Sequence, residues 1–575
     1  MNVLVIFGEN LPKKNKSWWR QFDRVIASNG LKEKILAQGF SFVDIEKLIS
    51  PGSVQQAYEF VNKLSCLTLP DGSRLSKLII YQGYELWWAH YDSIYKRFCL
   101  PYTQYADLLF YLKDFERVYL FEPPWPDLFR YFLKAHCRQC FIARRFRLKG
   151  LLPLSLGVFI QFTFSLISLL WLKITKPKVM IRTGDKFESY RDFDFRQGFI
   201  YKELRKRKIP FVEFIRSLES SPTILRHAWQ RKRPVIYSAA IIDILHSFAR
   251  RLSPFKNQRL PAGLGDNPEK RFWFLVAAHY LHNINGTIWS IRAMKFILQW
   301  IGVKSALIAA GGERSVHEIL GCKLAGIKTV GIFHGAMPRY YFVSDFMPEF
   351  DGQNPLSQDK YGLWSEWWRN YYLKYSRAFK PEQLYISGSL RPIEKAVDEP
   401  PPAGSAASEG PLKVLFISEQ LASPKEVMPY LLALLSAEDF ILSLKIRPQI
   451  DGFERWLKKN EPDTLKRVEI SKGNIHQTIS ESDVAVGSHS TAVLEALAQL
   501  KPFVFFRTNK WGDYFDIKSA GLNKFFAETP QELIENIRKS PEIPEDELKK
   551  LQEQFFGNPR QNGAEWAVDQ IQKFL

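Results

Sequence analysis

The fold is indicated most clearly by a short apolar run, a turn of small hydroxyl residues and a helical pattern at residues 484–498, VAVGSHSTAVLEALA. The run 484–486 is short, β-branched and apolar, as expected of a strand that is buried on both faces. The residues after the turn repeat apolar types with the period of a helix. This order of elements predicts the repeating unit of an α/β protein with parallel strands.

The same kind of apolar run recurs along the chain, and helical patterns separate most of the copies. The other runs cover residues 3–7, 78–81, 118–121, 179–182, 306–310, 329–333, 384–387, 414–417, 442–446 and 503–506. The segment 399–411, EPPPAGSAASEGP, cannot build a core and predicts a linker. We therefore expect two α/β units, residues 1–398 and residues 412–575.

Length and composition exclude several classes of protein. A chain of 575 residues is too long for one ordinary domain, and 46% apolar with 14% aromatic residues excludes a disordered or fibrous protein. Five cysteines exclude a disulfide scaffold and are typical of a reducing compartment. No signal peptide is expected, because Met1 leads directly into an apolar run without a basic segment.

The positive charge is confined to one part of the chain. Residues 128–260 carry 28 basic and 8 acidic side chains, which accounts for the whole net charge of +20. Within this part, residues 150–172 carry no charge, and basic residues flank them on both sides. As a helix, this run would be about 34 Å long, enough to cross the apolar core of a bilayer.

Positive charge on both flanks gives no asymmetry between the two sides of a membrane, and Pro153 and Gly157 interrupt the run. We therefore interpret residues 144–178 as a helix or broken hairpin that lies in one leaflet and contacts anionic headgroups. A true membrane span and a core helix of a soluble domain are the alternatives.

Small hydroxyl residues follow the strand 484–486, at the edge where open parallel sheets bind ligands. Ser488, Ser490 and Thr491 stand at the start of a predicted helix, whose first amides and positive dipole end attract an anion such as a diphosphate. Glu495 lies one turn deeper on the same face, where its carboxylate could accept hydrogen bonds from a ribose. Simple N-capping by Ser490 or Thr491 explains the pattern equally well.

Other charged or titratable side chains follow further predicted strands. Arg447 comes after the strand 442–446, where it could bind phosphate oxygens or form a surface ion pair. Glu313 and His334 follow the strands 306–310 and 329–333. If these strands are neighbours, the carboxylate and the imidazole share one cleft edge, where they could accept a proton from an attacking hydroxyl and stabilise a departing phosphate. A purely structural histidine is the alternative for His334.

The order of these motifs resembles that of GT-B glycosyltransferases of bacterial surface-polysaccharide synthesis, the group near capsule polysialyltransferases and polyol-phosphate (CDP-glycerol type) transferases. The resemblance covers residues 300–530 and rests on order and spacing, because none of the motifs is distinctive alone. The motifs are GGERS at 311–315, GIFHG at 331–335, YGLWSE at 361–366, KIRP at 445–448 and STAVLEA at 490–496.

The resemblance implies a GT-B fold, in which two Rossmann-like domains face each other across a cleft. Residues 1–398 would hold the acceptor, and residues 412–575 would bind a nucleotide-activated donor. Ser490, Thr491 and Glu495 match the donor-binding helix start. Many relatives have His-Pro where this chain has Arg447-Pro448, and an arginine keeps the contact to phosphate but cannot donate a proton at neutral pH.

On the acceptor side, the resemblance matches His334 to a His-Gly strand end and Glu313 to an acidic position that could be the base. The implied reaction moves a sugar, with inversion, from a nucleotide sugar to a polysaccharide or a lipid-linked acceptor. The nucleotide sugar is then a co-substrate, and no metal or other cofactor is required.

The expected location is the cytoplasmic face of the inner or plasma membrane, with peripheral or monotopic attachment to an anionic surface. A polyol-phosphate transferase on the same fold is one alternative. A non-catalytic nucleic-acid-binding protein that uses the basic segment is another, but the uncharged run 150–172 argues against it, so no nucleic-acid partner is expected.

Overall fold

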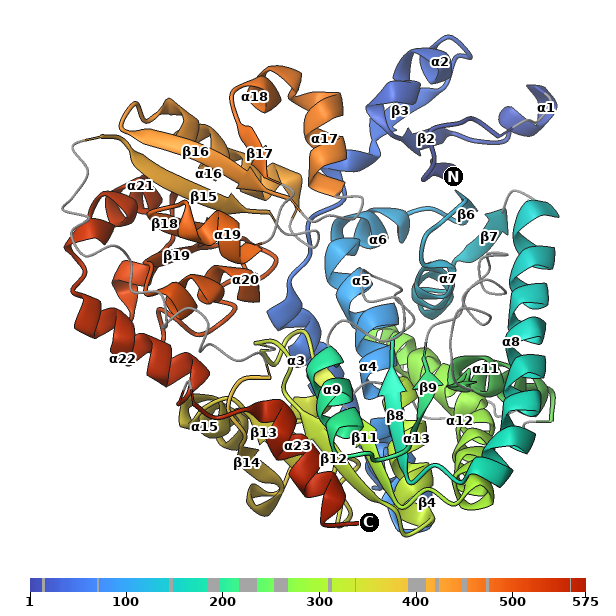
Figure 1. Cartoon of the computed structure of the whole chain (residues 1–575). Coiled ribbons are helices and arrows are strands. Elements are labelled where there is room, and N and C mark those ends of the chain that lie inside the picture. The colour runs from blue at the N-terminus through green and yellow to red at the C-terminus, as the bar shows by residue number, and fades with distance from the viewer. Residues whose placement is uncertain are drawn as a thin grey trace.

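The computed structural model describes residues 1–12, 16–69, 72–143, 148–184, 197–216, 235–252, 267–308, 313–336, 338–390, 410–418, 423–446, 452–471, 475–558 and 560–575. Within these residues the chain forms three parallel sheets and one antiparallel two-stranded hairpin. Each parallel sheet forms the centre of one lobe (Figure 1). The α/β class predicted from the sequence is confirmed.

The N-terminal part of the chain, residues 1–143, contains a five-stranded parallel sheet with the order β3-β2-β1-β6-β7. Its strands are β1 (Asn2–Ile6), β2 (Arg24–Ala27), β3 (Ser41–Asp44), β6 (Arg117–Phe121) and β7 (Gln139–Ala143). The hairpin of β4 (Ile80–Tyr81) and β5 (Tyr84–Glu85) contacts the middle lobe, where Arg292 donates a hydrogen bond to the Tyr81 hydroxyl at 3.0 Å. The helices of residues 1–143 are α1 (Lys16–Trp19), α2 (Lys32–Leu36), α3 (Val54–Ser65), α4 (Tyr91–Ile94), α5 (Leu100–Gln104), α6 (Ala106–Leu112) and α7 (Pro126–Ala135).

The middle lobe contains a seven-stranded parallel sheet with the order β10-β9-β8-β11-β12-β13-β14. Its strands are β8 (Val179–Thr183), β9 (Phe211–Ile215), β10 (Val235–Ile236), β11 (Ser305–Ile308), β12 (Lys328–Ile332), β13 (Lys360–Leu363) and β14 (Leu384–Ile386). Its helices are α8 (Leu148–Thr175), α9 (Gly198–Lys206), α11 (Ser238–Arg251), α12 (Pro268–Ile301), α13 (Glu313–Leu324), α14 (Val343–Phe346) and α15 (Glu366–Tyr375).

The C-terminal lobe contains a six-stranded parallel sheet with the order β17-β16-β15-β18-β19-β20. Its strands are β15 (Leu412–Ile417), β16 (Phe440–Lys445), β17 (Glu469–Ser471), β18 (Val484–Gly487), β19 (Phe503–Phe506) and β20 (Phe526–Ala527). Its helices are α16 (Pro424–Ser436), α17 (Gly452–Asn460), α18 (Pro462–Lys466), α19 (Ile475–Ser480), α20 (Thr491–Leu494), α21 (Pro530–Arg538) and α22 (Glu545–Phe556).

The last helix, α23 (Gly563–Gln572), returns from the C-terminal lobe to the middle lobe (Figure 1). Its apolar face, which includes Ala567 and Ile571, packs with Val330 and Ile332 of β12 in one buried cluster. Residues 563–572 therefore belong to the middle lobe. The expected C-terminal unit of residues 412–575 is corrected in this respect: the parallel sheet ends before α23 begins.

The expectation of one Rossmann-like unit in residues 1–398 is also corrected, because two separate parallel sheets lie there. The last strand of the first sheet, β7, and the first strand of the second, β8, are joined through the long helix α8. No stretch rich in Pro, Gly or Ser marks this boundary, so composition carried no signal for it. The predicted linker 399–411 lies largely outside the described residues, between β14 and β15.

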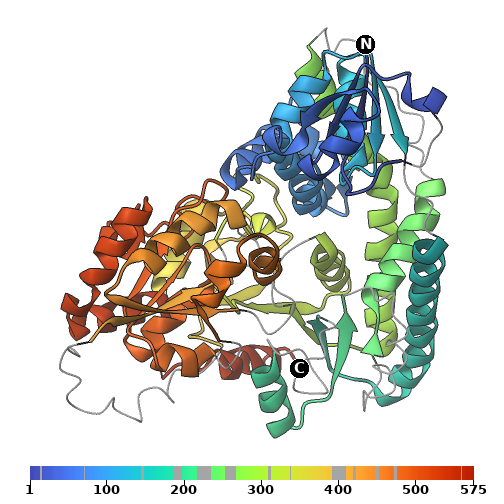
Figure 2. The same cartoon turned by 90° about the horizontal axis from the view of Figure 1, so that it is seen from above.

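The uncharged run 150–172 forms one continuous helix, α8, so the broken-hairpin alternative is wrong. Pro153 falls near the amino end of this helix, where a missing N–H costs little. Figures 1 and 2, which view the molecule from two perpendicular directions, both place α8 along the outer edge of the molecule. It contacts α11, α12 and β10 of the middle lobe.

A buried apolar cluster joins the three lobes. It contains Leu109 and Phe129 of the N-terminal lobe, Trp364 of the middle lobe, and Leu494 and Phe555 of the C-terminal lobe. The N-terminal lobe also touches the C-terminal lobe directly, since the Val54 amide donates a hydrogen bond to the Lys510 carbonyl oxygen at 3.0 Å. The site described next lies close to this three-way junction.

Candidate functional site

The C-terminal sheet is doubly wound, and its strand order reverses between β15 and β18. Such a switch point leaves a crevice at the carboxyl ends of the two strands, where ligands of α/β proteins bind. The predicted donor turn, residues 488–491, leaves the sheet at this point. Gly487 is required here, because a Cβ atom would lie 2.6 Å from Val493 Cγ2 and 3.1 Å from the Ile417 carbonyl oxygen.

The hydroxyl residues of this turn are largely occupied by local contacts. Ser490 caps α20 by accepting a hydrogen bond from the Ala492 amide at 3.2 Å, as the N-capping alternative supposed. Ser488 Oγ lies 2.7 Å from His489 Nδ1. The His489 ring stacks on Trp511, with 4.7 Å between the ring centroids.

The helix expected at residues 492–498 is shorter than predicted. α20 covers four residues and continues as a 3₁₀ turn, Glu495–Gln499, which ends at Leu500 in a left-handed conformation. Such a short helix has little macrodipole, so attraction of an anion must come from individual amides and side chains.

Thr491 connects the donor turn to the middle lobe. Its hydroxyl donates a hydrogen bond to the Ala336 carbonyl oxygen at 3.2 Å. Ala336 lies two residues after His334, in the loop that follows β12. The loop that carries the half-buried His334 therefore contacts the donor turn, although the two belong to different lobes.

A second contact fixes the same loop to the C-terminal lobe. Arg339 forms an ion pair with Asp516 at 2.7 Å, and its guanidinium lies 3.9 Å from the centroid of the Tyr375 ring. Burial disfavours the Arg339 cation, but the hydroxyl of Tyr371 and the carboxylate of Asp516 raise the pKa of Arg339 well above its ordinary value. Arg339 was not expected from the sequence, where its only signal is its position five residues after His334.

Two lysines bring positive charge to the carboxyl edge of the C-terminal sheet. Lys445 ends β16 and is 7% exposed, with its Nζ atom 3.4 Å from the Ile446 carbonyl oxygen and 3.5 Å from that of Ser471. Lys510 lies in the loop after β19, and its Nζ atom is 5.3 Å from the centroid of the Trp511 ring. Burial lowers the pKa of both lysines, although the charge of Glu426 partly offsets the effect at Lys510.

Glu495 faces α19 at this edge. Its carboxylate lies 3.9 Å from His476 Nε2, and its side chain is 19% exposed. His476 stands in the first turn of α19, which follows β17. The pair is thus placed near the carboxyl ends of β17 and β18, one turn from the donor turn.

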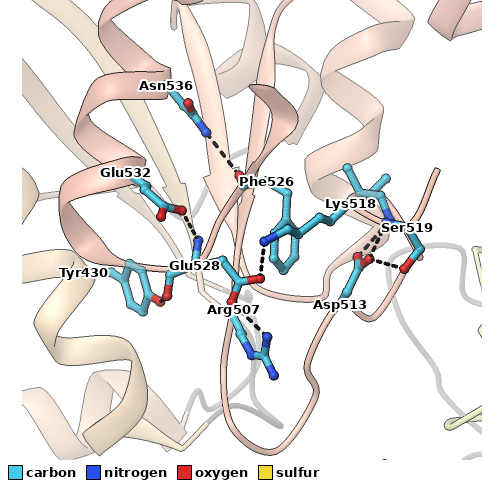
Figure 3. A network of polar contacts seen from close by, with 10 residues as sticks. Tyr430, Arg507, Asp513, Lys518, Ser519, Phe526, Glu528, Glu532 and Asn536 are labelled. Carbon is cyan, nitrogen blue, oxygen red and sulfur yellow. Dashed lines mark hydrogen bonds and ion pairs between the residues drawn. The ribbon is translucent and has the colours of Figure 1, made fainter. Parts of the chain in front are cut away.

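The loop between β19 and β20 is fixed by ion pairs (Figure 3). Arg507 and Lys518 both pair with Glu528, at 2.8 and 2.7 Å, and these partners lower the pKa of the Glu528 carboxyl. Asp513 accepts hydrogen bonds from the Ile517 and Ser519 amides, at 2.8 and 3.0 Å. These contacts hold in place the loop that carries Lys510 and Trp511.

The middle sheet has a switch point between β8 and β11. At its carboxyl edge Arg182 of β8 forms a buried ion pair with Glu318 of α13, and Ser238 donates a hydrogen bond to the same carboxylate. Burial raises the pKa of the Glu318 carboxyl, and Arg182 and Ser238 act against this rise. The helix that carries Glu318 begins at Glu313, so this pair anchors the segment that bears the predicted base.

The structure places the remaining predicted residues as follows. β11 and β12 are paired in parallel, so Glu313 and His334 follow neighbouring strands on one edge, as expected. The backbone of Glu313 begins α13, but its side chain is outside the described part of the chain, and Arg447 lies outside it entirely. Among the described residues, no group of three or more His, Cys, Asp or Glu side chains is placed to hold a metal ion.

No protein-family model and no curated protein sequence matches this chain. Three similar solved structures are a UDP-GlcNAc 2-epimerase from Neisseria meningitidis bound to UDP-GlcNAc, the glycotransferase of kitacinnamycin and a glycosyltransferase from Rickettsia africae ESF-5. Their sequences are 13%, 12% and 13% identical to this chain, with TM-scores of 0.40, 0.41 and 0.38. Each match covers 69% of this chain and 100%, 99% and 98% of the other. These values are too low to assign a family or an activity.

Proposed function

We propose that the chain is a glycosyltransferase of the GT-B type, which moves a sugar from a nucleotide-activated donor to a polysaccharide or lipid-linked acceptor. One observation carries the proposal: the Thr491 hydroxyl bonds to the Ala336 carbonyl oxygen. This contact joins the switch-point turn of the C-terminal lobe to the His334 loop of the middle lobe. A donor held by the first surface therefore lies beside the groups of the second.

The C-terminal lobe is the donor side in this proposal. The Lys445 and Lys510 cations and the amides of residues 488–491 bind the phosphates, and Glu495 accepts hydrogen bonds from the ribose. Arg447 follows Lys445 by two residues and is assigned to the same phosphates. Positive groups that are fixed before the reaction stabilise the charge that develops on the leaving nucleotide.

The middle lobe is the acceptor side. Glu313 accepts the proton of an acceptor hydroxyl, and that oxygen forms a bond to the anomeric carbon from the face opposite the nucleotide. The bond between the anomeric carbon and the phosphate oxygen breaks, so the leaving nucleotide keeps the electron pair and the configuration inverts. His334 stabilises the departing phosphate. Transfer is assigned to the cytoplasmic face of the membrane.

A thermal-shift screen tests the donor class. Compounds of CMP, CDP, UDP, GDP and dTDP are compared, because a ligand that binds only the folded state raises the melting temperature. Glu495→Ala should abolish the shift, whereas Glu313→Ala should keep the shift and stop release of the nucleotide from the donor. Glu481→Ala, which removes an exposed glutamate of the same lobe, is the matched control and should change neither.

The screen can also contradict the proposal. A shift with CDP-polyols but with no nucleotide sugar would identify a polyol-phosphate transferase instead. If no nucleotide shifts the parent protein, or if Glu495→Ala and Glu313→Ala both behave like the parent, the assignment of the site is wrong.

A further inference from the structure

The helix α8 is apolar on its exposed side as well as on the side that packs against the protein, where Val158 and Leu172 are buried, whereas a surface helix of a soluble protein exposes a polar face. Its exposed apolar side chains recur with helical spacing and form one stripe. They are Phe159 (62% exposed), Leu166 (47%), Ile167 (60%), Leu170 (67%), Trp171 (57%) and Ile174 (76%). We call these six residues the α8 stripe. Such a large apolar face at the surface marks an interaction site.

Two polar side chains of α8 point into the protein. Gln161 and Ser165 are fully buried, and Ser165 Oγ accepts a hydrogen bond from the Tyr237 amide at 2.9 Å. Thr163 is exposed, but its hydroxyl donates a hydrogen bond to the Phe159 carbonyl oxygen at 3.0 Å within the helix. The stripe therefore presents almost no polar group that would need water.

The end of α12 extends the exposed apolar surface. Phe296 and Trp300 are 63% and 40% exposed, and their rings lie 5.9 Å apart. Lys173 joins this pair to α8, because its ammonium group donates a hydrogen bond to the Trp300 carbonyl oxygen at 3.1 Å and lies 4.5 Å from the centroid of the indole. Aromatic rings beside lysines are typical of the interface between water and lipid.

The charge around the stripe selects an anionic occupant. Between Asp127 and Asp185 the sequence has no acidic residue and eleven basic ones. Lys173 and Lys176 lie on either side of Ile174 at the carboxyl end of the stripe, Lys178 follows, and all three are exposed. An apolar stripe bordered by lysines fits the surface of a bilayer that contains anionic lipids.

We propose that the α8 stripe, with Phe296 and Trp300, docks this protein in one leaflet of an anionic membrane, with α8 parallel to the membrane plane. Within the described residues, Gly157–Thr175 is long and apolar enough to span, with a mean hydropathy of 1.7. However, α8 packs on α11, α12 and β10, and a spanning orientation would carry this part of the middle lobe into the hydrocarbon. In the parallel orientation only the apolar stripe enters the lipid.

Flotation with lipid vesicles tests the docking surface. The parent protein should float with vesicles of phosphatidylcholine and phosphatidylglycerol, and less with phosphatidylcholine alone. The triple variant Ile167→Asn/Leu170→Asn/Ile174→Asn should lose at least about tenfold in partitioning, because three inserted side chains become polar. The triple variant Lys173→Gln/Lys176→Gln/Lys178→Gln should lose the preference for phosphatidylglycerol and keep part of the binding.

The control changes three apolar side chains on other surfaces that are 39%, 41% and 46% exposed: Leu373→Asn/Leu432→Asn/Ile441→Asn. This control should float like the parent. Its flotation separates the effect of the stripe from a general loss of apolar surface. The nucleotide-induced thermal shift should be unchanged in the Ile167/Leu170/Ile174 variant, so a failure of docking and a failure of the proposed activity are distinguishable.

Two further measurements decide between occupants and orientations. Cysteines at positions 149 and 176 should both react with a membrane-impermeant maleimide from the outside of sealed vesicles, with the labelled peptides identified by mass spectrometry. Reaction at only one end would show a span and overturn the proposal. The proposal would also be overturned if the Ile167/Leu170/Ile174 variant floated as well as the parent. It would be overturned too if the parent formed a dimer in lipid-free solution and this variant did not, because the stripe would then bind a second copy of the chain.

Discussion

The carboxyl edges of the middle and C-terminal sheets have the same topology but differ in how their charges are held. At the middle edge, the buried Arg182 is paired with the buried Glu318, so cation and anion compensate each other. At the C-terminal edge, the buried Lys445 faces the carbonyl oxygens of Ile446 and Ser471. The same strand order therefore places a buried ion pair at one edge and a buried lysine at the other. In the proposed donor site Lys445 is assigned to the phosphates, whereas the Arg182–Glu318 pair stabilises the middle lobe.

The largest expected effect breaks the compensated pair. Glu318→Ala leaves the Arg182 guanidinium buried without its partner, which should lower the free energy of unfolding by about 3–5 kcal/mol. Urea unfolding measures the loss. Glu366→Ala is the control, because Glu366 pairs with Arg369 at the surface and should cost less than about 1 kcal/mol. Equal losses in the two variants would show that the Arg182–Glu318 pair does not stabilise the middle lobe.

The next effect concerns the cation of the C-terminal edge. Lys445→Met should weaken binding of a nucleotide by about tenfold to a hundredfold, since a hydrogen bond to a charged group contributes about 1.5–3 kcal/mol. Calorimetric titration with the nucleotide selected by the thermal-shift screen measures the affinity. Unchanged affinity would remove Lys445 from the donor site and, with it, the contrast between the two edges.

The pH dependence of nucleotide binding is a second test of the role of Lys445. Burial lowers the pKa of Lys445 in the free protein, and a bound phosphate favours the charged lysine and raises that pKa again. Binding should therefore take up a proton, and the affinity should fall by up to about tenfold per pH unit as the pH rises above the pKa of the free protein. Titration in buffers with different heats of ionisation detects the proton.

Lys445→Arg is the matched variant for the pH experiment. Arginine stays protonated, so the affinity of this variant should not change with pH over the same range. The proposal for Lys445 fails if the parent and Lys445→Arg show the same pH profile.

The smallest effect concerns the contact between the two edges. Thr491→Val keeps the shape of the side chain but removes the hydrogen bond to the Ala336 carbonyl oxygen, which contributes about 1 kcal/mol. Turnover should fall about fivefold, while the affinity for the nucleotide changes by less than about twofold. Thr464→Val, on α18 of the same lobe, should change neither quantity. A loss of affinity without a loss of turnover would place Thr491 in donor binding alone.

Much of the fold could be predicted because long buried parallel strands are near-continuous apolar runs. Strands such as β1, β12 and β18 were found in this way. The edge strands β3 and β7 were missed, because they expose part of their side chains and so lack the apolar pattern. The inner strands β2, β9 and β13 were missed as well, because a charged residue begins or interrupts each of these short runs. The boundary between the first two lobes was missed because a helix joins them, so no flexible linker marks the boundary in the sequence.

Part of the candidate site could be predicted because some of its residues lie close to buried strands in the sequence. His334 lies two residues beyond β12, and Ser490 and Thr491 begin the helix that follows β18, so their position at the carboxyl edge follows from the local sequence. Arg339 and Lys510 lie in loops several residues beyond a strand, and nothing in the nearby sequence fixes where such loops return. The short α20 was unpredictable because the 3₁₀ turn ends at Leu500, whose left-handed conformation local propensity disfavours.

The sequence by itself determined the α/β class, the turn at residues 488–491 and the presence of an uncharged helix in a basic segment, because periodicity and charge are local properties of the chain. Only the tertiary structure decided that three lobes share the chain, that Thr491 meets Ala336, and that α8 buries Gln161 and Ser165 while its apolar stripe faces outward. These features depend on which surfaces pack together, and packing brings together residues that are far apart in the sequence.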